Sequence, residues 1–409
     1  CGEVPAPEEH LPITLPEEIN FNIKGNPLDN HPTWKHTQCP KCNKDATRET
    51  DTFDTFFESS WYFARFTDLN PSSAFTEEAV NYWMPVDQYI GGVEHAVMHL
   101  LYSRFFMRAL KHVNSINLEE PFTSLQTQGM VCHQTFKTNK EHWVFPSDVI
   151  KKDNEYFHLQ TKEPVIAGRI EKMSKSKKNV VDPQQIIDDF GADTARFFML
   201  SDSPPNRDME WSDSGVEGSW RFLNKLWKFV QALPNKKIKD ELPKNISIQN
   251  RELLTFMNTT IKDVTKAIDE FHFNIAVAQI RSLFNLVSSY KIENDNDAKV
   301  VLFVTSKLLI LINPMVPHLA EELWFTLGNK NSISNECWPK VDLSYIQKDN
   351  IKIPIQVNGK VRAVIEVPID LDKSDIEEIA LKEKNVLKFL NKNPKKVIII
   401  PNRVVNFVI

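Results

Sequence analysis

The chain contains 409 residues, of which 41% are hydrophobic and 25% are charged, and its formal net charge is −5. This length is too great for one core, so two to four domains of ordinary globular composition are expected. No apolar run reaches 18 residues and no signal peptide is present, so neither membrane insertion nor export is indicated, and five dispersed cysteines predict a reducing, cytoplasmic setting.

Residues 1–50 are rich in proline and have little apolar periodicity, which predicts a linker. Within it, Cys39-Pro40-Lys41-Cys42 has the spacing of one half of a zinc ribbon. The complementary pair is missing, because the other three cysteines are scattered at positions 1, 132 and 337, although His31 and His36 lie nearby. An inert knuckle is therefore favoured over a zinc site, and Cys39 and Cys42 stay candidate ligands.

Residues 51–170 change to an alternation of strand and helix. Residues 87–90 predict a short strand that ends in Gly91-Gly92, and residues 94–109 predict a helix. The expected apolar face of this helix consists of Val97, Leu100, Leu101, Phe105 and Met107. A glycine pair between a parallel strand and a helix lets a ligand approach the backbone, and ligands of open α/β sheets lie at the carboxyl ends of strands. We therefore expect an adenosine site here, with a plain turn as the alternative.

His95 and His99 are four residues apart, so a helix would place them on one face. Such a pair can bind zinc, but the metalloprotease motif is HExxH, whereas this sequence is EHxxxH. Uncharged imidazoles that line an apolar substrate pocket fit the sequence better, and a buried structural histidine is the alternative. Residues 136–170 have a mixed polar sequence and predict a short insertion.

The run Lys172-Met173-Ser174-Lys175-Ser176 places two ammonium groups and two hydroxyls on five residues. Lysine is a compact charge on a flexible stem, and serine hydroxyls add hydrogen bonds. The run therefore predicts a mobile loop that binds a polyphosphate, with a solvated basic loop as the alternative. Asp182 as N-cap and Pro183 at the first helical position then begin a helix that Gly191 ends, and residues 193–200 predict another helix.

Residues 215–340 predict an antiparallel helix bundle, with amphipathic stretches at 220–233, 251–271, 275–290 and 299–312. Prolines at positions 314 and 317 separate its last two helices. Several aromatic residues of this region recur at helical spacing and are expected in the core. They are Trp227, Phe229, Phe256, Phe284 and Trp324.

Residues 341–409 predict a small α+β module. Apolar residues alternate at 351–357 and at 361–367 on either side of Asn358-Gly359, a strong hairpin signal, and a helix at 373–390 and strands at 396–400 and 404–409 follow. From Tyr345 to Ile409 twelve Lys/Arg stand against eight Asp/Glu. This surplus predicts binding to an RNA backbone, with a solvated lysine-rich surface as the alternative. The candidate contacts are Lys360, Arg362, Lys388, Lys392, Lys395 and Lys396.

Taken together, these motifs resemble those of a known enzyme family. The run at 172–176, KMSKS, is the second signature of the class I aminoacyl-tRNA synthetases. Four further segments, 51–62, 89–99, 128–131 and 191–196, occur in the order and rough spacing found in leucyl-tRNA synthetases, so the resemblance covers essentially the whole chain. Isoleucyl and valyl enzymes share the general plan and stay as alternatives, while Tyr89, His95 and His99 favour leucine.

The resemblance implies a multidomain fold with α/β and all-α parts. Residues 1–50 would follow the editing insertion, residues 51–170 would form the second half of a Rossmann-type catalytic domain, and residues 171–214 the signature loop and stem-contact fold. Residues 215–340 would form an anticodon-binding-type bundle, and residues 341–409 an α+β domain that contacts the outer corner of the tRNA. The family's HIGH motif and editing domain are missing, so we expect a C-terminal portion that is inactive without the N-terminal half.

The resemblance also implies roles for single residues in the activation of leucine by ATP and Mg²⁺ and its transfer to tRNA(Leu). Lys172 and Lys175 would neutralise charge on the β- and γ-phosphates, with Lys175 the more direct, and Ser174 and Ser176 would add hydrogen bonds to the phosphate oxygens. The adenosine side would consist of Gly91, Gly92, Glu94, His95, Gly129 and Met130. The leucine side would consist of Phe56, Ser59, Tyr89, His95 and His99. The alternatives are a non-catalytic tRNA-binding accessory subunit and a zinc-dependent protein built on Cys39, Cys42 and the two histidines.

Overall fold

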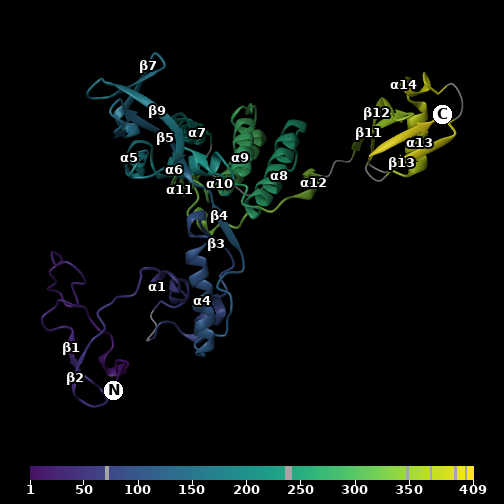
Figure 1. Cartoon of the computed structure of the whole chain (residues 1–409). Helices are drawn as coiled ribbons and strands as arrows, with labels where there is room; N and C mark the ends of the chain where they lie inside the picture. Colours follow the sequence, from purple (N-terminus) through teal and green to yellow (C-terminus); the bar gives the residue numbers. More distant parts are fainter. Residues whose placement is uncertain (70–72, 235–241, 347–349, 369–370, 391–393, 401–402) are drawn as a thin grey trace. The chain divides into compact units, whose positions relative to one another are not determined.

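The structure is a computed structural model that describes the chain apart from residues 70–72, 235–241, 347–349, 369–370, 391–393 and 401–402. The chain divides into two compact units, an N-terminal unit, Cys1–Gly129, and a C-terminal unit, Met130–Ile409. Figure 1 labels helices and strands of both units where there is room. Both units combine helices with small sheets, which confirms the expected mixture of α/β and α parts.

The first 50 residues contain little regular structure. A 3-10 turn, η1 (Glu8–His10), is followed by strands β1 (His36–Gln38) and β2 (Asp45–Thr47), which pair antiparallel. The turn between the two strands begins at Cys39, whose amide donates to the Lys44 carbonyl over 2.8 Å. The expected linker therefore contains a small hairpin that carries the Cys-x-x-Cys sequence at its tip.

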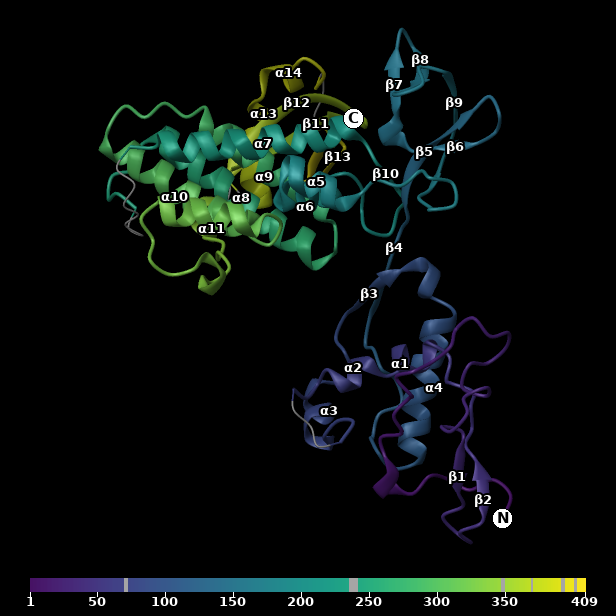
Figure 2. The ribbon, with the colours of Figure 1, turned by 90° about the vertical axis from the view of Figure 1, so that its left-hand side faces the viewer.

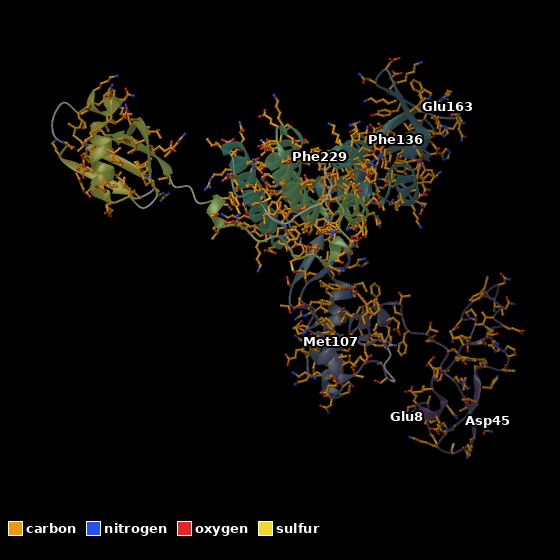
Figure 3. The ribbon with its side chains drawn as sticks, turned by 180° about the vertical axis from the view of Figure 1, so that it is seen from behind. Glu8, Asp45, Met107, Phe136, Glu163 and Phe229 are labelled. Carbon is orange, nitrogen blue, oxygen red and sulfur yellow. The ribbon has the colours of Figure 1, made fainter. Side chains whose placement is uncertain are left out.

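The rest of the N-terminal unit is built around two parallel strands. Strand β3 (Tyr89–Gly92) pairs with β4 (Leu125–Gln128), and η2 (Val93–His95) and helix α4 (Met98–His112) connect them. Three short helices precede β3, namely α1 (Phe56–Ser59), α2 (Tyr62–Arg65) and α3 (Glu77–Trp83). Met107 of α4, labelled in Figure 3, packs in a core with Phe63, Ala64, Val80, Met84 and Ile116.

Helix α4 differs from the expectation in its start and in its buried face. It begins at Met98, four residues later than predicted, because Val93–His95 form a separate 3-10 turn. Its buried residues are His99, Ser103 and Met107. Three residues of the expected apolar face are instead exposed: Val97 by 74%, Leu101 by 62% and Phe105 by 63%. The predicted burial of these three residues is wrong. We call Val97, Leu101 and Phe105 the outer face of α4.

The C-terminal unit begins with a sheet in the order β10-β5-β9-β8-β7, part of which is seen edge-on in Figure 2. Strands β5 (Val131–Thr138) and β9 (Pro164–Lys172) form its antiparallel centre, and β10 (Met209–Glu210) runs parallel to β5. The expected insertion is an extension of this sheet by β6 (Trp143–Val144), η3 (Pro146–Asp148), β7 (Val149–Lys152) and β8 (Glu155–His158). The KMSKS run starts at the last residue of β9.

The first of the two helices after the KMSKS run has the predicted capping residues. The Asp182 carboxylate accepts from the Gln184 amide over 2.9 Å at the start of α5 (Pro183–Phe190). Gly191 has a φ of +85°, which side chains strongly disfavour, and it allows the chain to turn directly from α5 into α6 (Ala192–Ser201). The predicted start and end of the first helix are confirmed.

The helix bundle that follows has the expected antiparallel pattern. Its elements are α7 (Asp213–Ala232), α8 (Ile248–Asp269), α9 (Phe273–Ser288), α10 (Asp295–Ile312), α11 (Pro317–Thr326), η4 (Ile333–Asn335) and α12 (Leu343–Ile346). Of the expected core aromatics, Phe284 and Trp324 are buried, and Trp227 and Phe229 pack against the core. Phe256 is exposed, because the buried residues of α8 include Leu254, Met257 and Ile261 on another face, so its predicted core position is wrong.

The last module is a four-stranded sheet in the order β12-β11-β14-β13. Its elements are β11 (Asn350–Val357), β12 (Lys360–Pro368), α13 (Lys373–Lys382), α14 (Lys384–Leu387), β13 (Lys396–Ile400) and β14 (Val404–Val408). Asn358 and Gly359 have φ values of +50° and +79° and form the predicted hairpin turn. The single helix predicted at 373–390 is instead two helices, because Glu383 has an extended backbone between them.

A bulge in β12 changes the expected alternation of buried residues. Ile355 lies opposite Ala363, whereas Gln356 lies opposite Val361, so Arg362 is the extra residue. An extra residue moves the side chains beyond it to the other face of the sheet. Ile365 and Val367 are buried as predicted, but Val361 is exposed, contrary to its expected place.

Candidate functional site

Three polar side chains of the N-terminal unit form a chain of hydrogen bonds. The Tyr89 hydroxyl lies 2.7 Å from His99 Nε2 and 2.7 Å from the Tyr62 hydroxyl. Strand β3 supplies Tyr89, the first turn of α4 supplies His99 and α2 supplies Tyr62. The Tyr89 ring stacks on Phe122 with the ring centroids 3.9 Å apart, which fixes its direction. Two residues expected on the leucine side, Tyr89 and His99, are therefore in direct contact.

Tyr89 and His99 are uncharged at neutral pH. Burial lowers the pKa of His99, and the nearby His95 lowers it further, so the imidazole is neutral at pH 7. Burial and the hydrogen bond with Tyr62 raise the pKa of Tyr89, so the phenol keeps its proton. A few fixed, neutral polar groups can orient a small ligand without demanding a charged partner.

His95 and His99 do not share one helix. His95 lies exposed in η2, whereas His99 is 7% exposed within α4. The expected common helical face is therefore wrong, because α4 begins only at Met98. The two imidazoles are still close enough for His95 to lower the pKa of His99. Within the described part of the chain, neither histidine belongs to a group of three candidate metal ligands, which gives no support to a zinc site built on this pair.

Phe56 and Ser59 lie on α1, which contacts α4. The Phe56 ring centroid is 5.8 Å from that of Tyr102 on α4. The Ser59 hydroxyl donates to the Phe56 carbonyl over 3.1 Å, so its hydrogen bond lies within α1. Ser59 also lines a surface hollow of about 450 Å³ together with Tyr62.

Tyr62 is a candidate site residue that was not predicted from the sequence. Its hydroxyl reaches Tyr89, its ring lies 6.4 Å from the His99 ring, and it lines the same hollow as Ser59. It therefore links the Tyr89–His99 pair to the residues of α1. Its signal in the sequence is its place at the end of the segment 51–62.

Gly91 and Gly92 are the last residues of β3 and lie beside Thr127 and Gln128 of β4. A Cβ atom on Gly92 would collide with the Glu94 carboxylate, whereas a Cβ atom on Gly91 would meet no atom within 4 Å. The end of β3 therefore offers open backbone at Gly91 and a carboxylate folded over Gly92. Such a strand end allows a nucleoside to approach the main chain.

Gly129 is the last residue of the N-terminal unit, and Met130 is the first of the C-terminal unit. The Met130 amide donates to Asp208 Oδ1 over 2.7 Å, and its carbonyl accepts from the Met209 amide over 2.9 Å. Both polar groups of the Met130 backbone are thus used within the C-terminal unit. Sequence reasoning missed Asp208, because its contact depends on the pairing of β10 with β5.

The KMSKS run lies at the end of β9. Lys172 is the last residue of that strand, and the Met173 amide donates to the Val131 carbonyl of β5 over 3.0 Å. Residues 175–178 form a turn, in which the Lys178 amide donates to the Lys175 carbonyl over 3.3 Å. Lys172 and Lys175 are exposed. The arrangement places two ammonium groups on one short loop, where they can meet an anion.

The two serines of this run bond within the loop. Ser174 Oγ lies 3.0 Å from Ser176 Oγ and accepts from the Lys177 amide over 3.2 Å. Lys177 itself pairs with Glu171 of β9. The serine hydroxyls therefore shape the turn in this structure.

Three cysteine thiols converge in the first 50 residues. The Sγ atoms of Cys1, Cys39 and Cys42 all lie within 4.8 Å of one another. Hydrogen bonds from the backbone of Lys41 and then of Cys42 lower the pKa of Cys39, which favours its thiolate form. The expectation that Cys1 lies apart from the Cys-x-x-Cys pair is therefore wrong, because the fold returns the first residue to the hairpin. Three thiolates are ligands that suit zinc.

Five of the six expected RNA contacts lie among the described residues, and Lys392 falls outside them. Lys360, Lys395 and Lys396 are exposed at or next to the first residues of β12 and β13. Lys388 donates to Asn385 Oδ1 over 3.2 Å. Arg362 differs, because its guanidinium lies 3.9 Å from the centre of the Phe389 ring and is half-buried against it.

Family models and curated relatives match this chain. Residues 250–379 match the anticodon-binding domain of tRNA ligases, and residues 141–212 match the class I tRNA synthetases of the I, L, M and V types. The chain is 48% identical over 412 residues to the leucine–tRNA ligase of Paramagnetospirillum magneticum and 47% identical over 409 residues to that of Rickettsia bellii. The match covers 100% of this chain but 48% of each relative, so the chain spans about half their length.

A solved structure shows the same fold. It is the LeuRS of Agrobacterium radiobacter K84 in a ternary complex with tRNA and LeuAMS, which matches with a TM-score of 0.78 and 31% sequence identity. The match covers 100% of this chain and 48% of that chain. Among the described residues, no helix combines the length and apolar character needed to cross a membrane.

Proposed function

We propose that this chain, which belongs to the class I aminoacyl-tRNA synthetases and is homologous to about half of a leucine–tRNA ligase, supplies the C-terminal half of such an enzyme. Together with the N-terminal half it activates leucine with ATP and transfers it to tRNA. The observation that carries the proposal is the intact KMSKS run at the end of β9, with Lys172 and Lys175 exposed.

In the first step the leucine carboxylate attacks the α-phosphate of ATP, which forms leucyl adenylate and releases pyrophosphate. Such a step depends mainly on positioning and on stabilising charge. Lys172 and Lys175 neutralise the charge on the β- and γ-phosphates of the substrate, which enters as its Mg²⁺ complex. The adenosine lies at the end of β3, where Gly91 leaves the backbone open and Glu94 can accept from ribose hydroxyls.

The leucine side is formed around the Tyr62–Tyr89–His99 chain. Its polar groups orient the amino acid, while Phe56 and neighbouring rings provide apolar walls for the isobutyl group. A pocket of this kind separates side chains that differ by one methylene by only about 1–3 kcal/mol. Discrimination against valine and isoleucine therefore depends on the shape of these walls.

The outer face of α4 is the surface to which the N-terminal half of the catalytic fold would bind. Val97, Leu101 and Phe105 leave a large apolar area exposed on that helix, and covering such area contributes about 25 cal/mol per Å². The chain accounts for 48% of the length of its relatives. We therefore assign the cover to the N-terminal half of the same enzyme, which carries the HIGH motif in this family.

The tRNA is held by the C-terminal unit. Residues 250–379 match an anticodon-binding domain, and the exposed Lys360, Lys395 and Lys396 suit contacts with phosphates at the outer corner of the tRNA. A hydroxyl of the terminal ribose then attacks the leucyl carbonyl of the adenylate, which forms the ester and releases AMP.

Mixing experiments test the proposal. The chain and a separately expressed N-terminal half of a related leucine–tRNA ligase should each fail to exchange pyrophosphate into ATP in the presence of leucine, and the mixture should do so. In the mixture Lys175→Ala should raise the barrier by about 2–4 kcal/mol without weakening leucine binding, because the ammonium acts on charge that develops during the reaction. An inactive mixture in which the two halves bind each other would instead support an accessory tRNA-binding subunit.

A further inference from the structure

Asn179 is a fully buried polar residue within a run of lysines. Its side chain is 0% exposed, whereas Lys175, Ser176 and Lys178 on the same loop are exposed. Burying a side-chain amide costs free energy unless its donors and its acceptor find partners. The position of Asn179 therefore indicates a specific set of hydrogen bonds at the base of the loop.

The Asn179 side chain bonds to two strands and to the loop itself. Its Nδ2 donates to the carbonyls of His133 over 3.1 Å, Glu171 over 3.1 Å and Lys172 over 3.2 Å. Its Oδ1 accepts from the Ser174 amide over 2.9 Å. His133 lies in β5, and Glu171 and Lys172 lie in β9. The Asn179 side chain thus joins β5, the end of β9 and Ser174 of the loop.

These bonds close the loop at its base. Lys172 and Ser174 are both held by Asn179, and Met173 between them is held by the Val131 carbonyl of β5. Lys175 is the next residue and begins the turn at 175–178. The backbone on the N-terminal side of Lys175 is therefore fixed, so less conformational entropy has to be lost when its ammonium group binds an anion.

We propose that Asn179 is the positioning residue of the KMSKS loop and that it holds Lys172 and Lys175 in the orientation that meets the phosphates of ATP. This inference rests on the function proposed above. Asn179 acts through the loop backbone, because its own polar atoms are occupied by the strands and by Ser174. Aspartate has the same shape but no donor, so Asn179→Asp would leave three carbonyls facing a carboxylate.

Limited proteolysis of the complete chain tests the anchoring without the other half. Trypsin cuts after lysine, so sites at 172, 175, 177 and 178 report directly on the order of the loop. Asn179→Asp and Asn179→Ala should each speed cleavage there by about tenfold or more, because the base of the loop opens. Asn258→Asp is the matched control, since Asn258 is also buried and uses both ends of its amide, but in the bundle.

Equal cleavage rates in the wild type and in both Asn179 variants would overturn the anchoring. If neither variant folds, hydrogen exchange in the wild-type chain decides instead. The amides of Met173 and Ser174 should exchange slowly, and fast exchange of the Ser174 amide would overturn the inference.

Kinetics of the reassembled enzyme test the positioning role. Asn179→Ala should lower kcat for pyrophosphate exchange by about 10–100-fold and leave the KM for leucine within about twofold, because misplaced lysines fail mainly in the transition state. An unchanged kcat would overturn the role. If the wild-type halves are inactive together, the proposed function fails, whereas proteolysis and hydrogen exchange still decide whether Asn179 anchors the loop.

Discussion

The Asp193 carboxylate of α6 accepts a hydrogen bond from the Leu319 amide of α11 over 2.7 Å. Leu319 is the third residue of α11, and the helix's own N-cap residue, Val316, makes no side-chain capping bond. Asp193 therefore caps α11 from another helix. Arg196, one turn further along α6, donates to the carbonyls of Pro314 and Met315 over 2.8 Å and 3.1 Å. These two residues attach the helices after the KMSKS loop to the bundle.

Asp193→Ala should lower the free energy of unfolding of the C-terminal unit by about 0.5–2 kcal/mol, the usual cost of losing a helix N-cap. Urea denaturation of the complete chain, followed by far-ultraviolet circular dichroism, measures the change. Asp189→Ala is the control, because Asp189 is exposed on α5. Equal midpoints for the two variants would show that the carboxylate of Asp193 does not stabilise α11.

His99 should titrate below the ordinary histidine pKa of about 6.5. Burial, and then the nearby His95, lower its pKa. At pH values just below the ordinary histidine pKa, the folded unit therefore binds fewer protons than the unfolded chain. The contribution of His99 to stability is therefore complete above pH 6.5 and is lost as the pH falls through the folded pKa. Nuclear magnetic resonance titration of the imidazole checks this prediction, and a midpoint at or above the ordinary value would contradict it.

His95→Gln provides an internal check on the cause. Removing the neighbouring imidazole should move the pKa of His99 upward, while burial should still keep it below the ordinary value. No movement would show that burial alone is responsible.

The purified chain should hold about one zinc ion, since three thiolates form most of a tetrahedral zinc site. The basis is the approach of Cys1, Cys39 and Cys42 to within 4.8 Å of one another. Cys39→Ser should remove most of the metal, as measured by elemental analysis after purification without chelators. Cys337→Ser, which changes an exposed cysteine elsewhere in the chain, should retain it. Metal-free wild-type protein would refute the site.

The double change Lys395→Ala and Lys396→Ala should weaken tRNA binding by the complete chain and lower the slope of log affinity against log salt by about 2, or about one per phosphate contact. Both lysines are exposed, Lys395 just before β13 and Lys396 as its first residue. Lys382→Ala should have little effect, because Lys382 is paired with Glu378 on α13. If the double variant and the wild-type chain had the same salt slope, the two lysines would belong to a solvated surface that does not contact tRNA.

Local signals were enough to predict several elements. Asp182, Pro183 and Gly191 define a helix through interactions within a few residues, and Asn358-Gly359 defines a hairpin through backbone conformations that few other residues adopt. The KMSKS run was likewise visible as a loop with two lysines. Such features need no knowledge of distant contacts, so one sequence suffices to find them.

Other features depend on residues far apart in the chain. Leu101 and Phe105 were expected in a core, but α4 turns His99 and Met107 inward and leaves Leu101 and Phe105 exposed. Asn179 had no recognisable signal, because its partners lie on β5 and on the end of β9. Its importance is visible only when both strands are in place.

Leucine charging by the reassembled enzyme tests the central claim most directly. The chain, mixed with the N-terminal half of a related leucine–tRNA ligase, should attach labelled leucine to tRNA in an ATP-dependent reaction, and neither part alone should do so. Isoleucine and valine should be attached far more slowly under the same conditions. Preferential attachment of isoleucine or valine, or tRNA binding by the mixture without any charging, would contradict the account.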